Sequence, residues 1–135
     1  MNTVILVLAF VILAFLAYRF WKPMIQPPKT VVPANEARIY FFYTNWCGHS
    51  KKAMPEWEKL EAKLKSTNMF DKTHVTPVRV DAEADQATAT TYEVDAYPTV
   101  LLETRDGIFP YDKRVTSEGL FQFLRSKLGQ EQASL

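Results

Sequence analysis

The chain has 135 residues, which is the size of one ordinary globular domain. Apolar residues make up 47% of the chain and aromatic residues 13%, and this composition excludes a disordered protein. The formal net charge is +1, and the sequence has no basic stripe interleaved with aromatic residues. We therefore expect no nucleic-acid partner.

The residues that could bind a metal ion are few: one cysteine, Cys47, and two histidines, His49 and His74. A single cysteine excludes an internal disulfide bond and a zinc site built mainly from cysteines. Neither histidine has the spacing to the cysteine or to a carboxylate pair that is typical of a metal site. We therefore expect no metal ion in the monomer.

The N-terminal segment is strongly apolar. Residues 4–18 contain no charged side chain, and two aromatic residues extend the apolar stretch past Arg19. Counted as Thr3–Trp21, the segment would rise about 28 Å as a helix, close to the ~30 Å hydrocarbon core of a bilayer. We predict one transmembrane helix over residues 3–21, which makes the membrane a partner of this chain.

Two other interpretations of this segment fit the sequence less well than a membrane anchor does. A signal peptide would have Lys or Arg before the apolar run and a good small-x-small cleavage site after it, and the sequence has neither. A buried core helix would need a polar face, which is also absent from the sequence. The flanking charges Arg19, Lys22 and Lys29 all lie on the C-terminal side of the segment, which favours a cytoplasmic domain, with the lumen of the endoplasmic reticulum as the alternative.

A proline-rich segment follows. Residues 22–33 hold four of the eight prolines and show no helical periodicity. Such a segment favours an extended, polyproline-like conformation that spans at most about 37 Å. We predict a stiff spacer over residues 22–33, a globular domain over residues 34–129 and a frayed tail over residues 130–135.

The globular part alternates strand and helix patterns in the order β-α-β-α-β-β-α, which predicts an α/β fold with a central mixed sheet flanked by helices. Strands are predicted over residues 38–43, 75–80, 99–103 and 108–111, with the turn signal Arg105-Asp106-Gly107 between the last two. Helices are predicted over residues 48–65, 82–92 and 116–128. Pro55 should kink the first helix, Thr116 or Ser117 should cap the last, and Gly129 should end it.

The cysteine lies in the motif Trp46-Cys47-Gly48-His49-Ser50, between an apolar strand and a predicted helix. A cysteine in the first turn of a helix meets unpaired backbone N–H groups and the positive end of the helix dipole, and both favour a thiolate. His49 adds a potential positive charge nearby. We therefore expect the pKa of Cys47 to lie below the free value of about 8.5 and the thiolate to be reactive.

Ser50 occupies the position where a second cysteine would complete a Cys-x-x-Cys pair. A hydroxyl can donate a hydrogen bond to the thiolate, but it cannot attack a mixed disulfide. Release would therefore need another cysteine of the client or an external thiol such as glutathione. We expect no other cofactor.

These motifs resemble the thioredoxin superfamily, and within it the protein disulfide isomerase type of domain. The similar segments are residues 42–51, 54–57, 80–82 and 94–99, and the resemblance covers residues 37–128. It implies a thioredoxin fold with a cis bond between Tyr97 and Pro98. It also implies that the client is bound by a small set of residues, which are Trp46, Gly48, Ala96, Tyr97 and Pro98.

The sequence departs from the family's pattern at four points. Ser50 replaces the resolving cysteine, Phe41 stands where a buried glutamate is usual, and Ala96 stands where a glycine is usual. The family's first strand and helix are missing as well. We therefore expect a trimmed fold with four core strands, with residues 30–32 as a candidate fifth. The two replacements agree with each other, because in the family the buried glutamate mainly helps to move protons at the second cysteine.

Three hypotheses about function follow. The first is a membrane-tethered single-thiol protein that exchanges disulfides with protein clients, with Cys47, His49 and Ser50 as catalytic residues. The second is a non-catalytic client-binding or retention module that uses the cleft beside Tyr97 and Pro98. The third is a glutathione-dependent iron–sulfur carrier, because single-thiol glutaredoxins carry a Cys-Gly-x-Ser site, although Trp46 and His49 fit that family poorly.

Overall fold

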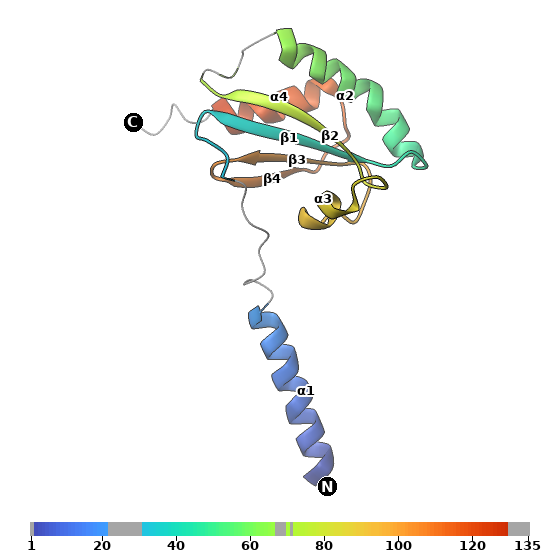
Figure 1. Cartoon of the computed structure of the whole chain (residues 1–135), viewed down its shortest axis with the longest axis vertical. Coiled ribbons are helices and arrows are strands. Elements are labelled where there is room, and N and C mark those ends of the chain that lie inside the picture. Colours follow the sequence, from blue (N-terminus) through green and yellow to red (C-terminus); the bar gives the residue numbers. More distant parts are fainter. Residues whose placement is uncertain (1, 22–30, 67–69, 71, 130–135) are drawn as a thin grey trace. The chain divides into compact units, whose positions relative to one another are not determined.

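The computed structural model describes residues 2–21, 31–66, 70 and 72–129 (Figure 1). The chain divides into two compact units, Met1–Thr30 and Val31–Leu135. Within the described part of the first unit there is a single helix, α1 (Asn2–Trp21). The large apolar side chains that α1 carries between Val4 and Tyr18 are exposed.

The prediction of a transmembrane anchor over residues 3–21 is wrong. No helix in the described part of the chain is both long enough and apolar enough to cross a membrane. The uncharged run over residues 4–18 rises only about 23 Å as a helix, which is short of the ~30 Å hydrocarbon core. Three further predictions depended on this anchor and are not supported without it. They are the single-pass membrane localisation, the cytoplasmic or lumenal side of the domain, and the membrane contact through Thr3–Trp21.

The second unit is built on a four-stranded sheet in the order β2-β1-β3-β4. β1 pairs parallel to β2 and antiparallel to β3, and β3 pairs antiparallel to β4. The mixed sheet and the order of the elements confirm the predicted thioredoxin-like α/β fold. The strands are β1 (Glu36–Tyr43), β2 (His74–Asp81), β3 (Thr99–Thr104) and β4 (Gly107–Tyr111).

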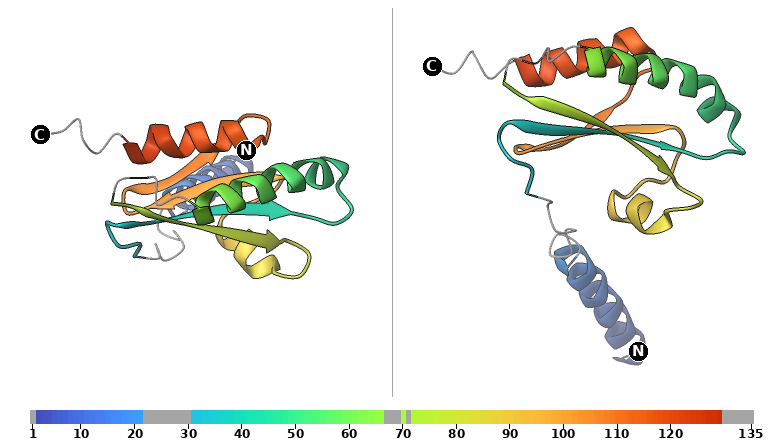
Figure 2. Two further views of the ribbon diagram at one scale, coloured as in Figure 1. Left: turned by 90° about the horizontal axis from the view of Figure 1, so that it is seen from above. Right: turned by 45° about the horizontal axis from the view of Figure 1, so that its top comes forward.

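Helices cover both faces of this sheet (Figures 1 and 2). α2 (Gly48–Ser66) and α4 (Ser117–Leu128) lie side by side on one face, and α3 (Gln86–Thr91) lies on the other. A hydrogen bond from the Ser117 backbone N–H to the Glu56 carboxylate, 2.9 Å long, joins α4 to α2. The sheet is therefore the middle layer of three.

The strand β1 supplies side chains to both cores because successive residues of a strand point to opposite faces. Ile39 and Phe41 are buried on the side of α2 and α4, whereas Tyr40 and Phe42 are buried on the side of α3. All the buried residues of the two core clusters belong to the second unit.

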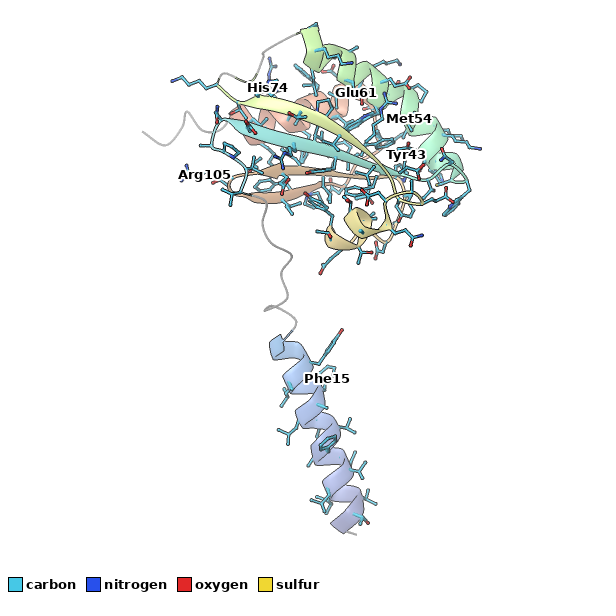
Figure 3. All side chains as sticks on the ribbon, viewed as in Figure 1. Phe15, Tyr43, Met54, Glu61, His74 and Arg105 are labelled. Atoms are coloured by element: carbon cyan, nitrogen blue, oxygen red, sulfur yellow. The ribbon has the colours of Figure 1, made fainter. Side chains whose placement is uncertain are left out.

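Side chains of α2 hold this helix to the sheet. The Trp57 ring is fully buried and stacks on Phe41 with ring centroids 5.0 Å apart. Its indole N–H donates to Glu61 at 2.7 Å, and Arg79 of β2 forms an ion pair with the same carboxylate. Figure 3 shows Met54 and Glu61 along α2 and Tyr43 at the end of β1.

Two predicted elements differ from the structure. Val31 and Val32 form no strand, so the candidate fifth strand is wrong for these residues, and Thr30 lies outside the described residues. Val32 is instead buried, with 3% of its surface exposed. The predicted helix over residues 82–92 is shorter, because the Asp85 carboxylate accepts a 3.0 Å hydrogen bond from the Thr88 N–H and thereby caps α3.

Other boundary predictions hold or lie outside the described residues. Thr116 is the N-cap of α4, since its side chain accepts a hydrogen bond from the Gly119 N–H, and Gly129 is the C-cap. Pro55 lies inside α2 as predicted. The predicted spacer falls outside the described residues except at 31–33, and so does the predicted tail over residues 130–135.

Candidate functional site

Cys47 lies between the end of β1 and the start of α2. Its carbonyl oxygen accepts a 3.1 Å hydrogen bond from the Lys51 N–H, which makes Cys47 the N-cap residue of α2. The backbone N–H groups of the first helical turn have no partner within the helix and lie close to the side chain of the capping residue. Cys47 is a free thiol and is half-buried.

Hydrogen bonds from the start of α2 lower the pKa of Cys47. The backbone N–H of Ser50 has the largest effect, and the Ser50 hydroxyl and the backbone N–H of His49 lower it further, against the opposing effect of partial burial. These donors stabilise the thiolate in preference to the thiol. His49 therefore acts here through its backbone, whereas the sequence pointed to its imidazole.

Ser50 lies behind the cysteine and is almost fully buried, with 1% of its surface exposed. Its hydroxyl oxygen accepts a 3.4 Å hydrogen bond from the backbone N–H of Thr44. Thr44 is itself buried, and its own hydroxyl has no hydrogen-bond partner among the described residues. The position of the missing second cysteine is thus occupied by a hydroxyl that is tied to the loop before Cys47.

The segment before β3 lies beside the cysteine. The Cys47 thiol donates to the carbonyl oxygen of Tyr97, with a sulfur–oxygen distance of 3.5 Å. The bond between Tyr97 and Pro98 is cis, as the family resemblance implied. Trp46 is 68% exposed, and its ring meets the Tyr97 ring edge to face with centroids 6.5 Å apart. Residues that are 50 positions apart in the sequence therefore surround one thiol.

The remaining predicted site residues lie at the edge of this cluster. Gly48 and His49 are exposed in the first turn of α2. A side chain at position 48 would meet nothing within 4 Å, so the space around Gly48 does not require a glycine. Ala96 is exposed, and its carbonyl oxygen accepts a 2.7 Å hydrogen bond from the Thr99 hydroxyl.

A second group of contacts near the cysteine was not anticipated from the sequence. The Asn45 side chain donates to the Asp81 carboxylate at 2.9 Å, and the Asn45 backbone N–H donates to Glu83 at 3.4 Å. These bonds join the loop before Cys47 to the last residue of β2 and to the loop that follows it. The strand topology could have indicated these contacts, because residues that follow two neighbouring parallel strands meet at the same edge of the sheet.

Phe41 fills the position where the family usually has a buried glutamate. It is fully buried and stacks between Trp57 and Tyr43. Among the described residues the one buried carboxylate is Glu103, which accepts 3.1 Å hydrogen bonds from two tyrosine hydroxyls. Glu103 pairs with Arg38 near the start of β1, at the opposite end of that strand from Cys47.

The described residues do not bring together three or more histidine, cysteine or carboxylate side chains that could hold a metal ion. The groups that the structure places around the Cys47 sulfur are the Ser50 hydroxyl, the backbone N–H groups of His49 and Ser50, and the Tyr97 carbonyl. Such groups suit attack on another sulfur atom.

Comparison with known proteins places this geometry in a family. A family model described as Thioredoxin matches residues 28–126. The chain is 32% identical over 98 residues to protein disulfide isomerase-like 2-1 of Oryza sativa subsp. japonica, which covers 71% of this chain and 25% of that protein. It is 33% identical over 90 residues to probable protein disulfide-isomerase A4 of Caenorhabditis elegans, which covers 67% of this chain and 14% of that protein.

A solved structure agrees with these matches. The first thioredoxin domain of mouse protein disulfide-isomerase A4 superimposes with a TM-score of 0.60 at 26% identity, covering 70% of this chain and 65% of that one. The chain thus spans a quarter or less of the length of the rice and nematode relatives and 65% of the solved mouse thioredoxin domain. On the match over residues 28–126, the chain belongs to the thioredoxin family, with relatives of the protein disulfide isomerase type.

Proposed function

We propose that this chain is a single-thiol thioredoxin-like protein that exchanges disulfides with protein clients through Cys47. The position of the Cys47 thiol is the main observation that supports this proposal. Cys47 caps the first turn of α2, where backbone donors lower its pKa, and it faces Tyr97 beside an exposed Trp46. A lowered thiol pKa and an open approach to the sulfur both favour attack on a disulfide.

Capture of a client is a balanced exchange of sulfur bonds. The Cys47 thiolate attacks one sulfur of a client disulfide, the bond between the two client sulfurs breaks, and the second client sulfur leaves as a thiolate that takes a proton from water. The products are a mixed disulfide between Cys47 and the client and one free client thiol. No electron is gained or lost overall in this step.

Release requires a thiol from outside the chain, because Cys47 is its only cysteine. A second cysteine of the client, or a small thiol such as glutathione, attacks the mixed disulfide and frees Cys47. Attack by the client's own cysteine gives a rearranged client disulfide. The chain would therefore isomerise or hold clients more readily than it would oxidise or reduce them.

The client would be held beside the thiol by Trp46, Gly48, Ala96, Tyr97 and Pro98. Trp46 and Tyr97 supply an apolar surface in edge-to-face contact, and the exposed indole is free to pack on a client side chain. The Tyr97 carbonyl, which accepts from the Cys47 thiol in the free protein, becomes available to a client N–H once the thiol is consumed.

The same surface supports a second candidate, a module that binds clients without covalent chemistry. It is favoured by the exposed Trp46 together with Ser50 at the position of the resolving cysteine. On this alternative, Cys47 contributes only its contact surface. The two candidates make opposite predictions for a variant that keeps the shape of Cys47 and loses its sulfur.

The experiment compares the full chain with Cys47→Ser. Each is incubated with a peptide that contains one intramolecular disulfide, and adducts are detected by mass spectrometry under non-reducing conditions. We expect the wild type to gain the mass of one peptide, a reductant to remove it, and Cys47→Ser to show no adduct. Failure of the wild type to form an adduct, with peptide binding equal in both proteins, would favour the non-covalent module.

A further inference from the structure

The carboxylate of Glu103 on β3 is buried, with 4% of the residue's surface exposed. A buried carboxylate is costly unless its oxygens are hydrogen-bonded. Its Oε2 atom accepts two hydrogen bonds of 3.1 Å, one from the Tyr40 hydroxyl and one from the Tyr92 hydroxyl. The Arg38 guanidinium lies 4.0 Å from the same oxygen. Tyr40 belongs to the same sheet as Glu103, whereas Tyr92 lies outside the sheet, at the end of α3.

The end of α3 has a defined geometry. Tyr92 is the C-cap residue, and the next residue, Glu93, has a positive φ of 54°. The Glu93 N–H donates to the Thr90 carbonyl at 3.0 Å. The Val94 N–H donates to the Ala89 carbonyl at 2.9 Å, and this pair of hydrogen bonds is the Schellman ending of a helix. Because a non-glycine residue keeps a positive φ only where its surroundings hold it there, the contacts around Tyr92 set the direction in which the chain leaves α3.

The chain that leaves α3 leads directly into the candidate site. The Tyr97 carbonyl, five residues after Tyr92, accepts a hydrogen bond from the Cys47 thiol at a sulfur–oxygen distance of 3.5 Å. Val94 and Tyr97 both pack against the core cluster on the α3 side of the sheet. The segment over residues 94–98 is therefore held by this core and by the end of α3, and a displacement of that end would also displace Tyr97.

The Tyr92 side chain connects the end of α3 to the sheet. Its ring lies 4.7 Å from the Tyr40 ring and 5.6 Å from the Phe42 ring, measured between centroids. Apolar contacts of this kind are largely non-directional, so they hold the ring against the sheet without fixing its exact position. A hydrogen bond has a preferred length and angle, and the one to Glu103 therefore specifies where the Tyr92 side chain lies.

We propose that Tyr92 is a positioning residue of the client site. Its hydrogen bond to Glu103 fixes the end of α3 and thereby the segment over residues 94–98, which presents Tyr97 beside the thiol. This inference rests on the proposed function and extends it, because it assigns the order of a client-binding segment to a buried contact away from Cys47. Tyr92 acts through the backbone of that segment and takes no part in the sulfur chemistry.

This role of Tyr92 affects one of the two quantities that describe capture. The limiting rate of adduct formation at saturating client depends on the Cys47 thiolate, which lies at the start of α2. The client concentration that gives half of this rate depends on the surface that holds the client. If the segment over residues 94–98 is loosened, client binding must reorder it, which raises the half-saturating concentration and leaves the limiting rate unchanged. A loss of overall stability changes neither quantity while the protein stays folded.

The chain offers a matched pair of variants for the test. Tyr92→Phe and Tyr40→Phe each remove one hydroxyl and retain the ring, and the two lost hydrogen bonds have the same length and the same acceptor atom. They differ in the element that the tyrosine holds, because Tyr40 lies within β1. The full-length proteins are given increasing concentrations of a peptide with one intramolecular disulfide, and the initial rate of adduct formation is measured by mass spectrometry. Thermal unfolding checks that both variants are folded at the assay temperature.

A second measurement reports on the segment in the absence of client. Hydrogen exchange of the Val94 N–H, which donates to the Ala89 carbonyl, follows local opening at the end of α3. We expect Tyr92→Phe to raise the half-saturating peptide concentration about five- to tenfold at an unchanged limiting rate, and to speed this exchange by a similar factor. Tyr40→Phe should stay within about twofold of the wild type in all three quantities.

An unchanged half-saturating concentration in Tyr92→Phe, or an equal increase in both variants, would overturn the role of Tyr92. A fall in the limiting rate alone would overturn it as well. If the wild type forms no adduct, the proposed function fails instead, and exchange of the Val94 N–H still tests the positioning role. Faster exchange in Tyr92→Phe alone would then support that role, and equal exchange in all three proteins would contradict it.

Discussion

Three residues around Cys47 have different roles. Trp46 is exposed beside the thiol, Ser50 is buried behind it, and Thr44 ties the preceding loop to Ser50. The three residues therefore lie in different parts of the site around Cys47. Substitutions at these three positions should therefore separate client contact, thiol chemistry and local packing.

Trp46→Ala should weaken client capture with little effect on folding. The indole is 68% exposed, so its removal uncovers little core surface. Loss of an aromatic anchor from an interface costs roughly 1–2 kcal/mol or more, which corresponds to about a five- to thirtyfold loss in apparent affinity. The measurement is the peptide concentration at half-maximal adduct formation, with urea unfolding as the control. An unchanged capture curve would remove Trp46 from the client surface.

Thr44→Val should leave the chemistry of Cys47 unchanged. Thr44 reaches Ser50 through its backbone N–H, which valine retains, and its own buried hydroxyl has no partner among the described residues. Replacing an unsatisfied buried hydroxyl by a methyl group of the same shape is neutral or stabilising, by up to about 1–3 kcal/mol. Equilibrium unfolding and the rate of thiol alkylation test both expectations. A slower alkylation rate would show that the hydroxyl itself is involved.

At the scale of elements, the position of α2 determines where the thiol lies. Trp57 packs under the helix against Phe41, and Arg79 of β2 forms an ion pair with Glu61. The hydrogen bond from Arg79 is the main cause that lowers the pKa of Glu61 below its usual value of 4.5, and the Trp57 N–H adds to it. This contact joins the helix that begins at Cys47 to the sheet.

Glu61→Gln should destabilise the domain in a pH-dependent way. Because the folded-state pKa of Glu61 is lowered, its stabilisation is fully present above pH 4.5 and is lost as the pH falls through the folded-state pKa. At pH 7 we expect a loss of about 1–2 kcal/mol in the free energy of unfolding. Urea unfolding at pH 7 and pH 3 gives the comparison. A difference between the two proteins that is as large at pH 3 as at pH 7 would contradict this account.

Most elements of the fold could be predicted from the sequence because their patterns are local. Strand alternation and helical spacing identified β1 to β4, α2 and α4, and the capping residue Thr116 marked the start of α4. The predicted start of α3 at residue 82 was too early, because the capping role of Asp85 was missed. The predicted membrane anchor is contradicted, because no helix among the described residues is both long enough and apolar enough to cross a membrane.

Only part of the candidate site could be predicted from local sequence patterns. Cys47 and Ser50 follow from one local motif, whereas the approach of Tyr97 came from the family resemblance, since no local pattern connects residues so far apart. The contacts of Asn45 with Asp81 and Glu83 depend on the pairing of β1 with β2. Such contacts can be predicted only when the strand order is already known.

At the scale of the whole molecule, the site and both core clusters belong to the unit Val31–Leu135. We therefore expect a chain without residues 1–30 to fold cooperatively and to keep the pKa of Cys47. Circular dichroism and pH-dependent alkylation of the shortened and full chains make the comparison. A pKa of Cys47 that rises on truncation would show that the first unit takes part in the site.

The central claim is that Cys47 is a nucleophile activated by the start of α2. Its most direct test is the rate of mixed-disulfide formation by the full chain as a function of pH, followed by mass spectrometry. The account predicts a Cys47-dependent adduct whose rate rises through a midpoint lower than that of a free cysteine. A midpoint at or above that value, or an adduct that persists in Cys47→Ser, would contradict it.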